Sequence, residues 1–221
     1  MSLILNIDTA LQTASVCLSE EGNSLQLLAN EDQKDHAAWL HSSIDAIMKT
    51  TGHQMKDLDA VAVSIGPGSY TGLRVGLAAA KGFCYALNIP LITVSTLELI
   101  AFAAKDEATD LICPMIDARR MEVFMAMYDK NVVEKIPQKT MILDESTVAD
   151  LFLSRHILFC GNANKKIEAF LSNKQASLSD SSANASHLAQ LSSVLFRMNK
   201  FADLAYCEPV YLKEFYSAQK S

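Results

Sequence analysis

The residues with the clearest potential for chemistry are a glycine-rich run, Gly-Pro-Gly-Ser, at positions 66–69. An apolar, β-branched run at 60–65 precedes it and predicts a buried strand, and a helix is predicted from the run to about Leu87. Backbone N–H groups at a helix N-terminus can bind an anion. However, no lysine follows either glycine, as a P-loop requires, and Gly72 comes one residue too late for the dinucleotide-binding fingerprint. Neither phosphate motif is therefore present.

The predicted helix carries a ridge of small residues, Gly72, Gly76 and Ala80, spaced four apart. Glycine inside a helix costs ~1 kcal/mol relative to alanine, so two glycines in one helix need a physical reason. Tight packing on the chain's own sheet is one explanation. A close helix–helix contact with a partner chain is a second, and an anion held at the helix N-terminus is a third. The ridge by itself is consistent with all three.

Histidine and cysteine positions argue against a metal site or a hydrolytic centre. His36 and His41 are five residues apart and do not share a helix face, and no HExxH, CxxC or GxSxG pattern occurs. Ser69 is explained as a turn and helix-capping residue. We therefore expect neither a metal ligand nor a peptidase nucleophile in this chain.

The composition indicates a folded, acidic protein. The chain has 221 residues, of which 50% are apolar, and a net charge of −6. A large phosphate-binding face needs many basic residues, so contact with nucleic acid is expected to be indirect. No apolar run approaches the ~20 residues that span a bilayer, and the five scattered cysteines indicate a reducing compartment. We predict a cytoplasmic protein that does not associate with membranes.

The apolar pattern predicts two similar halves joined by a polar stretch at 105–110. In the first half, strands and helices are expected at 3–7, 14–19, 25–29, 35–50, 60–65, about 70–87 and 91–94. In the second half, strands are expected at 111–117, 122–128 and 132–136, a Ser- and Asn-rich loop at 173–184, a helix at 186–199 and a mobile tail from about 215. We predict a first domain at 1–106 and a second at 107–221.

Residues 66–98, GPGSYTGLRVGLAAAKGFCYALNIPLITVSTLE, closely resemble the signature region of the bacterial TsaB (YeaZ) family. The order of elements also agrees from LILNIDTALQTASVCL at 3–18 onward, and YLK at 211–213 is similar to the closing segment of that family. The agreement is looser after about residue 120. The resemblance implies a partner of TsaD in forming threonylcarbamoyladenosine in tRNA.

The resemblance implies an α/β, actin/Hsp70/sugar-kinase-like (ribonuclease-H-like) fold with two lobes, mixed sheets and a reduced second lobe. In that superfamily the first hairpin approaches a nucleotide's phosphates, although the glycine expected there is missing here. The residues implied in a weak phosphate or nucleotide contact are Asp8, Thr9, Gly66, Gly68 and Ser69. The alternative for Asp8 is a residue that only forms the turn at the end of a strand.

The resemblance also implies that the two helices of the first half form the contact with TsaD or with a second copy of the chain. The implied interface residues are Ala37, Leu40, Ile44, Ile47, Met48, Gly72, Leu73, Val75, Gly76, Ala79, Ala80 and Phe83. Packing of the first helix on its own sheet is the alternative. In TsaD a His-x-x-x-His pair ligates the catalytic metal, and the matching positions here are Thr96 and Ile100. Because isoleucine cannot bind a metal, no transferase chemistry is expected.

We weigh three functions, of which the third has no supporting motif in the sequence. The first is a non-catalytic partner of TsaD, which forms a homodimer when alone, is joined by TsaE and contacts tRNA only indirectly. No cofactor is expected, except weak ATP or ADP binding at the partner junction. The second is an independent ATP-binding enzyme of the actin/sugar-kinase superfamily, and the third is a peptidase.

Overall fold

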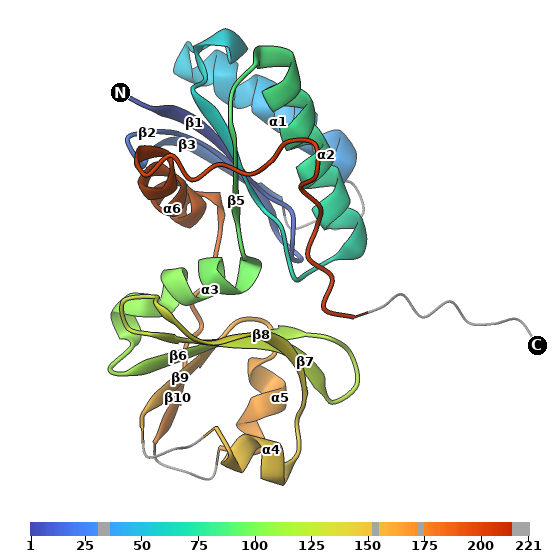
Figure 1. Cartoon of the computed structure of the whole chain (residues 1–221), viewed down its shortest axis with the longest axis vertical. Helices are drawn as coiled ribbons and strands as arrows, with labels where there is room; N and C mark the ends of the chain where they lie inside the picture. Colours follow the sequence, from blue (N-terminus) through green and yellow to red (C-terminus); the bar gives the residue numbers. More distant parts are fainter. Residues whose placement is uncertain (31–35, 152–154, 172–174, 214–221) are drawn as a thin grey trace, which may run out of the picture.

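A computed structural model describes residues 1–30, 36–151, 155–171 and 175–213. Two lobes, each built on a five-stranded mixed sheet, lie one after the other along the longest axis of the molecule (Figure 1). The predicted α/β class with mixed sheets is confirmed.

The first sheet has its two central strands buried on both faces. Its strands are β1 (Leu3–Asp8), β2 (Ala14–Glu20), β3 (Asn23–Asn30), β4 (Ala60–Ser64) and β5 (Leu91–Val94), in the order β3-β2-β1-β4-β5. β1 pairs antiparallel with β2 and parallel with β4. Burial on both faces explains the apolar run at the start of β4, whereas β1 also contains two buried polar residues, Asn6 and Asp8.

Helices cover both faces of this sheet. α1 (His36–Thr51) and α2 (Tyr70–Leu87) lie on one face, and α6 (Ala185–Arg197) lies on the other (Figure 1). A short 3-10 helix, η2 (Met55–Asp57), leads into β4. The first lobe therefore has three layers, with α2 packed on the central strands.

The second lobe follows a short 3-10 helix, η3 (Lys105–Glu107). Its strands are β6 (Leu111–Asp117), β7 (Glu122–Asp129), β8 (Glu134–Ile142), β9 (Ile157–Cys160) and β10 (Ala176–Leu178), in the order β10-β9-β6-β7-β8. α3 (Thr96–Ala104) packs on the face that is turned toward the first lobe. α4 (Glu145–Ala149) and α5 (Asn164–Glu168) pack on the opposite face.

The two sheets repeat one topology. In each sheet, the spatial order is third, second, first, fourth and fifth strand in sequence. α1 and α2 have 16 and 18 residues, whereas α4 and α5 have 5 each. The predicted duplication is confirmed as a topological repeat, and the second lobe is the reduced one.

Two elements of the second lobe differ from the prediction. β8 continues through Pro137 to Ile142, beyond the predicted end at 136, because an edge strand tolerates proline where the missing N–H would face solvent. β10 lies inside the predicted loop at 173–184. It has only three residues and therefore carries little periodicity.

The C-terminal part of the chain returns to the first lobe, so the prediction of one second domain at 107–221 is wrong for residues 185–213. Leu188 packs with Ile4 and Ile92 of the first sheet. Beyond α6, Ala202 forms a β-bridge to Leu91 of β5. The physical reason is that the first sheet needs its second face covered, and α6 is the amphipathic helix that covers it.

The helix starts are only partly as predicted. Ser69 caps α2 by accepting a hydrogen bond from the Gly72 N–H at 3.3 Å, as expected. α6 begins at Ala185 instead of the predicted Ser186 and is capped by Asn184, which accepts a hydrogen bond from the Ser186 N–H. The predicted start of α1 at Asp35 and the predicted mobile tail from 215 lie outside the described residues. Within the described ranges no helix combines the length and apolarity needed to cross a membrane.

Candidate functional site

The glycine-rich turn between β4 and α2 is closed against the first hairpin. The Ser69 N–H donates to the Ala10 carbonyl at 2.7 Å. A Cβ atom at Gly68 would lie closer than 3.0 Å to the same carbonyl oxygen, so only glycine fits there. On the other side of the turn, the Gly66 N–H donates to the Thr96 hydroxyl at 3.1 Å. The turn is therefore held by the chain's own polar groups on both sides.

The hairpin residues predicted to meet a phosphate are buried and bonded within the chain. Asp8 is 2% exposed and accepts hydrogen bonds from the Ser64 hydroxyl at 2.5 Å and the Ala10 N–H at 3.2 Å. Burial raises the pKa of Asp8, and these hydrogen bonds oppose the shift. Thr9 is fully buried, and its hydroxyl donates to the Gly72 carbonyl at 2.7 Å. Among the predicted phosphate residues, Ser69 is the exposed one and Gly68 is partly exposed.

The glycine ridge of α2 faces its own sheet. A Cβ atom at Gly72 would overlap the Thr9 carbonyl oxygen, and one at Gly76 would overlap the Thr9 hydroxyl. Gly76 also lies against Val63 and Ile7 of the central strands. The ridge is explained by close packing of α2 on the hairpin after β1. This corrects the prediction that Gly72, Gly76 and Ala80 form a surface for a partner helix.

Most of the other predicted interface residues lie in the same core. Those buried against the first sheet are Leu40, Ile44, Ile47, Met48, Leu73 and Ala80. Val75, Ala79 and Phe83 are partly buried against this core, and Ala37 is exposed. The buried residues stabilise the lobe and cannot also contact a partner, because the apolar stripe of an amphipathic helix turns inward.

The exposed face of α2 carries a different row of residues. It consists of Thr71, Arg74, Ala78, Gly82 and Tyr85. Tyr85 is 83% exposed. A Cβ atom at Gly82 would meet no atom within 4 Å, so the fold of the chain does not require glycine there. This row was missed in the sequence, although helical spacing opposite the apolar stripe was a signal that could have revealed it.

α1 lies beside α2 and exposes a row of its own. The rings of His41 and Phe83 meet edge to face with centroids 6.0 Å apart. Ala38, Ser42 and Ala46 are exposed on α1 at intervals of four, and Ala78 and Gly82 follow the same interval on α2. We call these two rows together the two-helix face, an exposed surface of mostly small side chains that also carries Arg74 and Tyr85.

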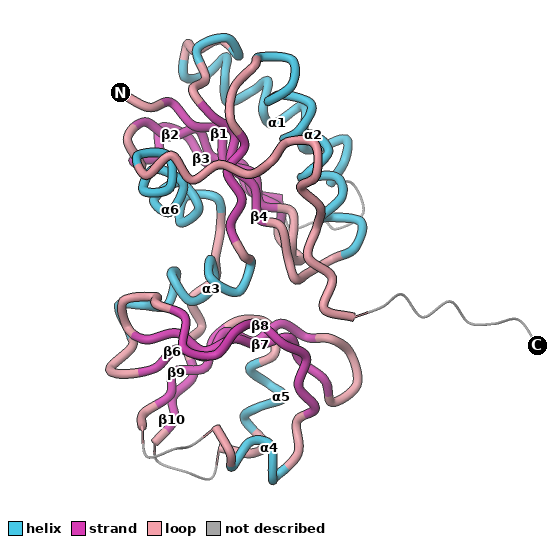
Figure 2. The backbone as a smooth tube through the Cα atoms, viewed as in Figure 1, coloured by secondary structure: helices cyan, strands magenta, loops and turns pink. Residues whose placement is uncertain are grey.

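The C-terminal segment, residues 200–213, runs along α2 (Figure 2). Lys81 of α2 donates to the carbonyl oxygens of Ala205 and Cys207 at 3.3 and 3.1 Å. Farther along, Thr140 of β8 donates to the Leu212 carbonyl, so the segment links the two lobes. In the sequence only YLK at 211–213 was recognised, as similar to the closing segment of the family, because contacts between residues so far apart leave no local pattern.

The segment at the start of α3 contains the two positions that match the TsaD metal ligands in the sequence resemblance, and both residues are packed in the core. Thr96 is buried, and its hydroxyl accepts from Gly66. Ile100 is 1% exposed and packs with Ile112 and Leu158. Within the described ranges, no group of three or more His, Cys, Asp or Glu side chains is arranged to hold a metal ion.

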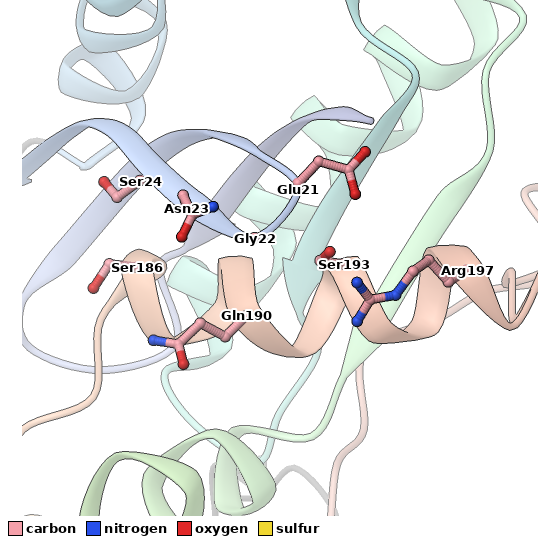
Figure 3. A pocket seen from close by; sticks show the side chains of 8 residues that line it. All are labelled: Glu21, Gly22, Asn23, Ser24, Ser186, Gln190, Ser193 and Arg197. Atoms are coloured by element: carbon pink, nitrogen blue, oxygen red, sulfur yellow. The ribbon is translucent and has the colours of Figure 1, made fainter. Parts of the chain in front are cut away.

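A cavity lies on the other side of the first sheet, between the β2–β3 hairpin and α6 (Figure 3). It has a volume of about 510 Å³. Its lining is polar and consists of Glu21, Gly22, Asn23, Ser24, Ser186, Gln190, Ser193 and Arg197. None of the residues predicted to contact a phosphate or a partner lies in it.

Comparison with known sequences places these features in a family. Residues 28–207 match the family described as TsaD, tRNA N6-adenosine threonylcarbamoyltransferase. The chain is also 30% identical to the tRNA threonylcarbamoyladenosine biosynthesis protein TsaB of Bacillus subtilis, over 72% of this chain and 70% of that protein. The chain belongs to the TsaB (YeaZ) family.

Further relatives of this TsaB family member support the same family assignment. TsaB of Escherichia coli is 35% identical over 58% of this chain, and TsaB of Haemophilus influenzae is 34% identical over 56%. These alignments span 55% and 52% of the two relatives, so the chain matches about half of their length.

Solved structures agree with the fold of this TsaB family member. YeaZ from Pseudomonas aeruginosa has a TM-score of 0.82 and 26% identity, covering 96% of this chain and all of that chain. An activator of 2-hydroxyisocaproyl-CoA dehydratase from Clostridium difficile has a TM-score of 0.51 at 10% identity, covering 90% of this chain and 95% of that one. The second likeness concerns the fold alone, and it is consistent with the expected actin- and sugar-kinase-like architecture.

Proposed function

We propose that this chain is a non-catalytic partner of TsaD in the formation of threonylcarbamoyladenosine in tRNA. The observation that carries the proposal is the burial of Thr96 and Ile100, which occupy the positions of the TsaD metal ligands implied by the resemblance. A member of this family without those ligands is expected to serve the reaction by binding the enzyme that has them.

The two-helix face is the proposed docking surface. Glycine at position 82 costs ~1 kcal/mol relative to alanine in a helix interior, and the packing within this chain does not account for that cost. Close approach of a partner helix would account for it, since small side chains let two helix backbones come together. The exposed Tyr85 on the same row supplies a large aromatic contact of the kind that interfaces favour.

Nucleotide binding by the isolated chain is not part of the proposal. Asp8 and Thr9 bond to the chain itself, and the turn at 66–69 lies closed on the hairpin. An independent ATP-binding enzyme would need these groups to be open to solvent.

The remaining partners follow from the same role. We propose that the chain forms a homodimer when alone, is joined by TsaE in the complex and contacts tRNA only indirectly, since its net charge is −6. The five free cysteines suit the reducing cytoplasm, where we place the protein.

Mixing the chain with TsaD from the same source tests the proposal. Light-scattering mass should reveal a one-to-one complex that replaces any homodimer. Gly82→Leu, which adds bulk to the two-helix face, should weaken the complex while the chain stays folded. Ala149→Leu is the matched control, because it adds bulk at an exposed helical position of the second lobe. If the two proteins stay separate at tens of micromolar, the docking role is wrong.

A further inference from the structure

Arg74 is an exposed side chain that two tyrosines hold in place. Its guanidinium carbon lies 4.0 Å from the centre of the Tyr70 ring and 6.0 Å from that of the Tyr211 ring. Its Nε donates to the Tyr211 hydroxyl at 3.0 Å. The two tyrosine rings are themselves 5.2 Å apart. Arg74 is therefore held both by its own helix, through Tyr70, and by the C-terminal segment, through Tyr211.

Among the residues that the structure describes, no carboxylate forms an ion pair with Arg74. The hydrogen bond to Tyr211 raises the pKa of Arg74, so the guanidinium stays charged. The Nε–H is occupied by Tyr211, and a guanidinium has four further N–H donors in a planar fork.

The charged residues of α2 itself are all basic, although the protein is acidic. α2 contains Arg74 and Lys81 but no Asp or Glu, while the whole chain carries a net charge of −6. Lys81 is bound to the carbonyl oxygens of the C-terminal segment. Arg74 is thus the cation that the exposed row of α2 presents to solvent.

We infer that Arg74 binds a carboxylate on the protein that docks at the two-helix face, and that Tyr70 and Tyr211 pre-organise it for this contact. The inference rests on the proposed docking function and adds the chemistry of the partner, which must place an Asp or Glu side chain opposite this end of α2. Arginine pairs with carboxylates through two parallel N–H···O bonds. Holding the fork in advance lowers the entropic cost of forming such a pair. The C-terminal segment therefore contributes to docking through Tyr211.

Binding of TsaD to purified variants of the full chain tests this inference. Loss of one partner from a desolvated, hydrogen-bonded charge pair weakens binding by about 30-fold or more. We expect Arg74→Ala to weaken binding by about 30-fold, and Arg74→Lys to recover only part of this loss because lysine lacks the planar fork. Tyr211→Phe removes the hydrogen bond but keeps the ring, and should give a smaller loss. The Kd of the wild-type chain should rise with salt more steeply than that of Arg74→Ala.

Lys81→Met is the matched control, because Lys81 lies on the same helix and also holds the C-terminal segment. If Arg74 acted only by holding that segment, Lys81→Met and Arg74→Ala would weaken binding equally, and this result would overturn the inference. A supporting result is the rescue of Arg74→Glu by an acidic-to-arginine change on TsaD.

Two further outcomes separate this inference from the docking function. If the wild-type chain binds TsaD and Arg74→Ala binds within threefold of it, the inference is wrong and the docking function stands. The same conclusion follows if Arg74→Ala leaves TsaD binding intact and lowers binding of ATP, because the fork would then serve a phosphate. If the wild-type chain does not bind TsaD at all, both proposals fail.

Discussion

Replacing Gly72 by alanine tests why α2 carries a ridge of small residues. The new Cβ atom would lie closer than 3.0 Å to the Thr9 carbonyl oxygen, a separation that real Cβ atoms essentially never show. That oxygen is a backbone atom of a buried hairpin, so it cannot rotate away as a flexible side chain could. Moving α2 outward would stretch the 2.7 Å hydrogen bond from the Thr9 hydroxyl to the Gly72 carbonyl.

The expected destabilisation combines three effects of known size. Overpacking costs about 1–3 kcal/mol, and a buried hydroxyl left without its partner costs about 1–3 kcal/mol. Alanine recovers at most ~1 kcal/mol through its higher helix propensity. We therefore expect Gly72→Ala to lower the free energy of unfolding by about 3 kcal/mol.

Urea denaturation followed by the fluorescence of Trp39 measures this loss. Trp39 is the single tryptophan of the chain and packs against the core of the first lobe, so it reports on the lobe that contains α2. Gly82→Ala is the matched control on the same helix, because its Cβ meets nothing within 4 Å. It should raise the free energy of unfolding by ~1 kcal/mol. If Gly72→Ala is as stable as the wild type, the ridge does not pack on the hairpin and our reasoning is refuted.

Three further predictions concern buried polar groups and the C-terminal segment. Because burial raises the pKa of Asp8 above its value in the unfolded chain, the charged form of Asp8 destabilises the fold. Asp8→Asn should therefore raise the free energy of unfolding at neutral pH. Urea titrations should find that this gain in free energy shrinks to zero as the pH falls below about 3.9. An equal gain at all pH values would contradict this linkage. Thr96→Val should lower the free energy of unfolding by about 1–3 kcal/mol, since it leaves the Gly66 N–H without an acceptor, and an unchanged urea midpoint would show that another group accepts it. Lys81→Met should loosen the C-terminal segment, so that a thiol reagent modifies the half-buried Cys207 several-fold faster than in the wild type. The buried Cys113 is the internal reference. Equal rates of modification of Cys207 in the variant and the wild type would mean that Lys81 does not hold the segment.

Local patterns were enough to predict the elements of the first lobe. The apolar run of β4 and the stop at Gly66 depend on neighbours in the sequence, and the observed bounds of β5 equal the predicted ones, as do those of β6 in the second lobe. The family resemblance depended on the same stretch, because its turn residues and helix residues are close together in the chain. The absence of ligands at Thr96 and Ile100 could also be deduced from residue type alone.

The direction in which each side chain points was decided by the tertiary structure. In the sequence, Gly72 and Gly76 are equally compatible with close packing against a partner helix and against a hairpin of the same chain. Only the position of Thr9 in the structure shows that they pack against the hairpin. Gly82 looked like one more small residue of the same helix, but the structure leaves it on the surface. Spacing along a helix tells which residues share a face, and not what that face meets.

Contacts between distant parts of the chain were likewise decided only by the fold. Nothing local to α6 indicates that it covers the first sheet rather than the second, since any amphipathic helix can cover either. The pairing of Arg74 with Tyr211, 137 residues apart, follows from the path of the C-terminal segment along α2. The sequence by itself therefore determined the elements and the family, and the packing of those elements decided which residues are left on the surface to bind a partner.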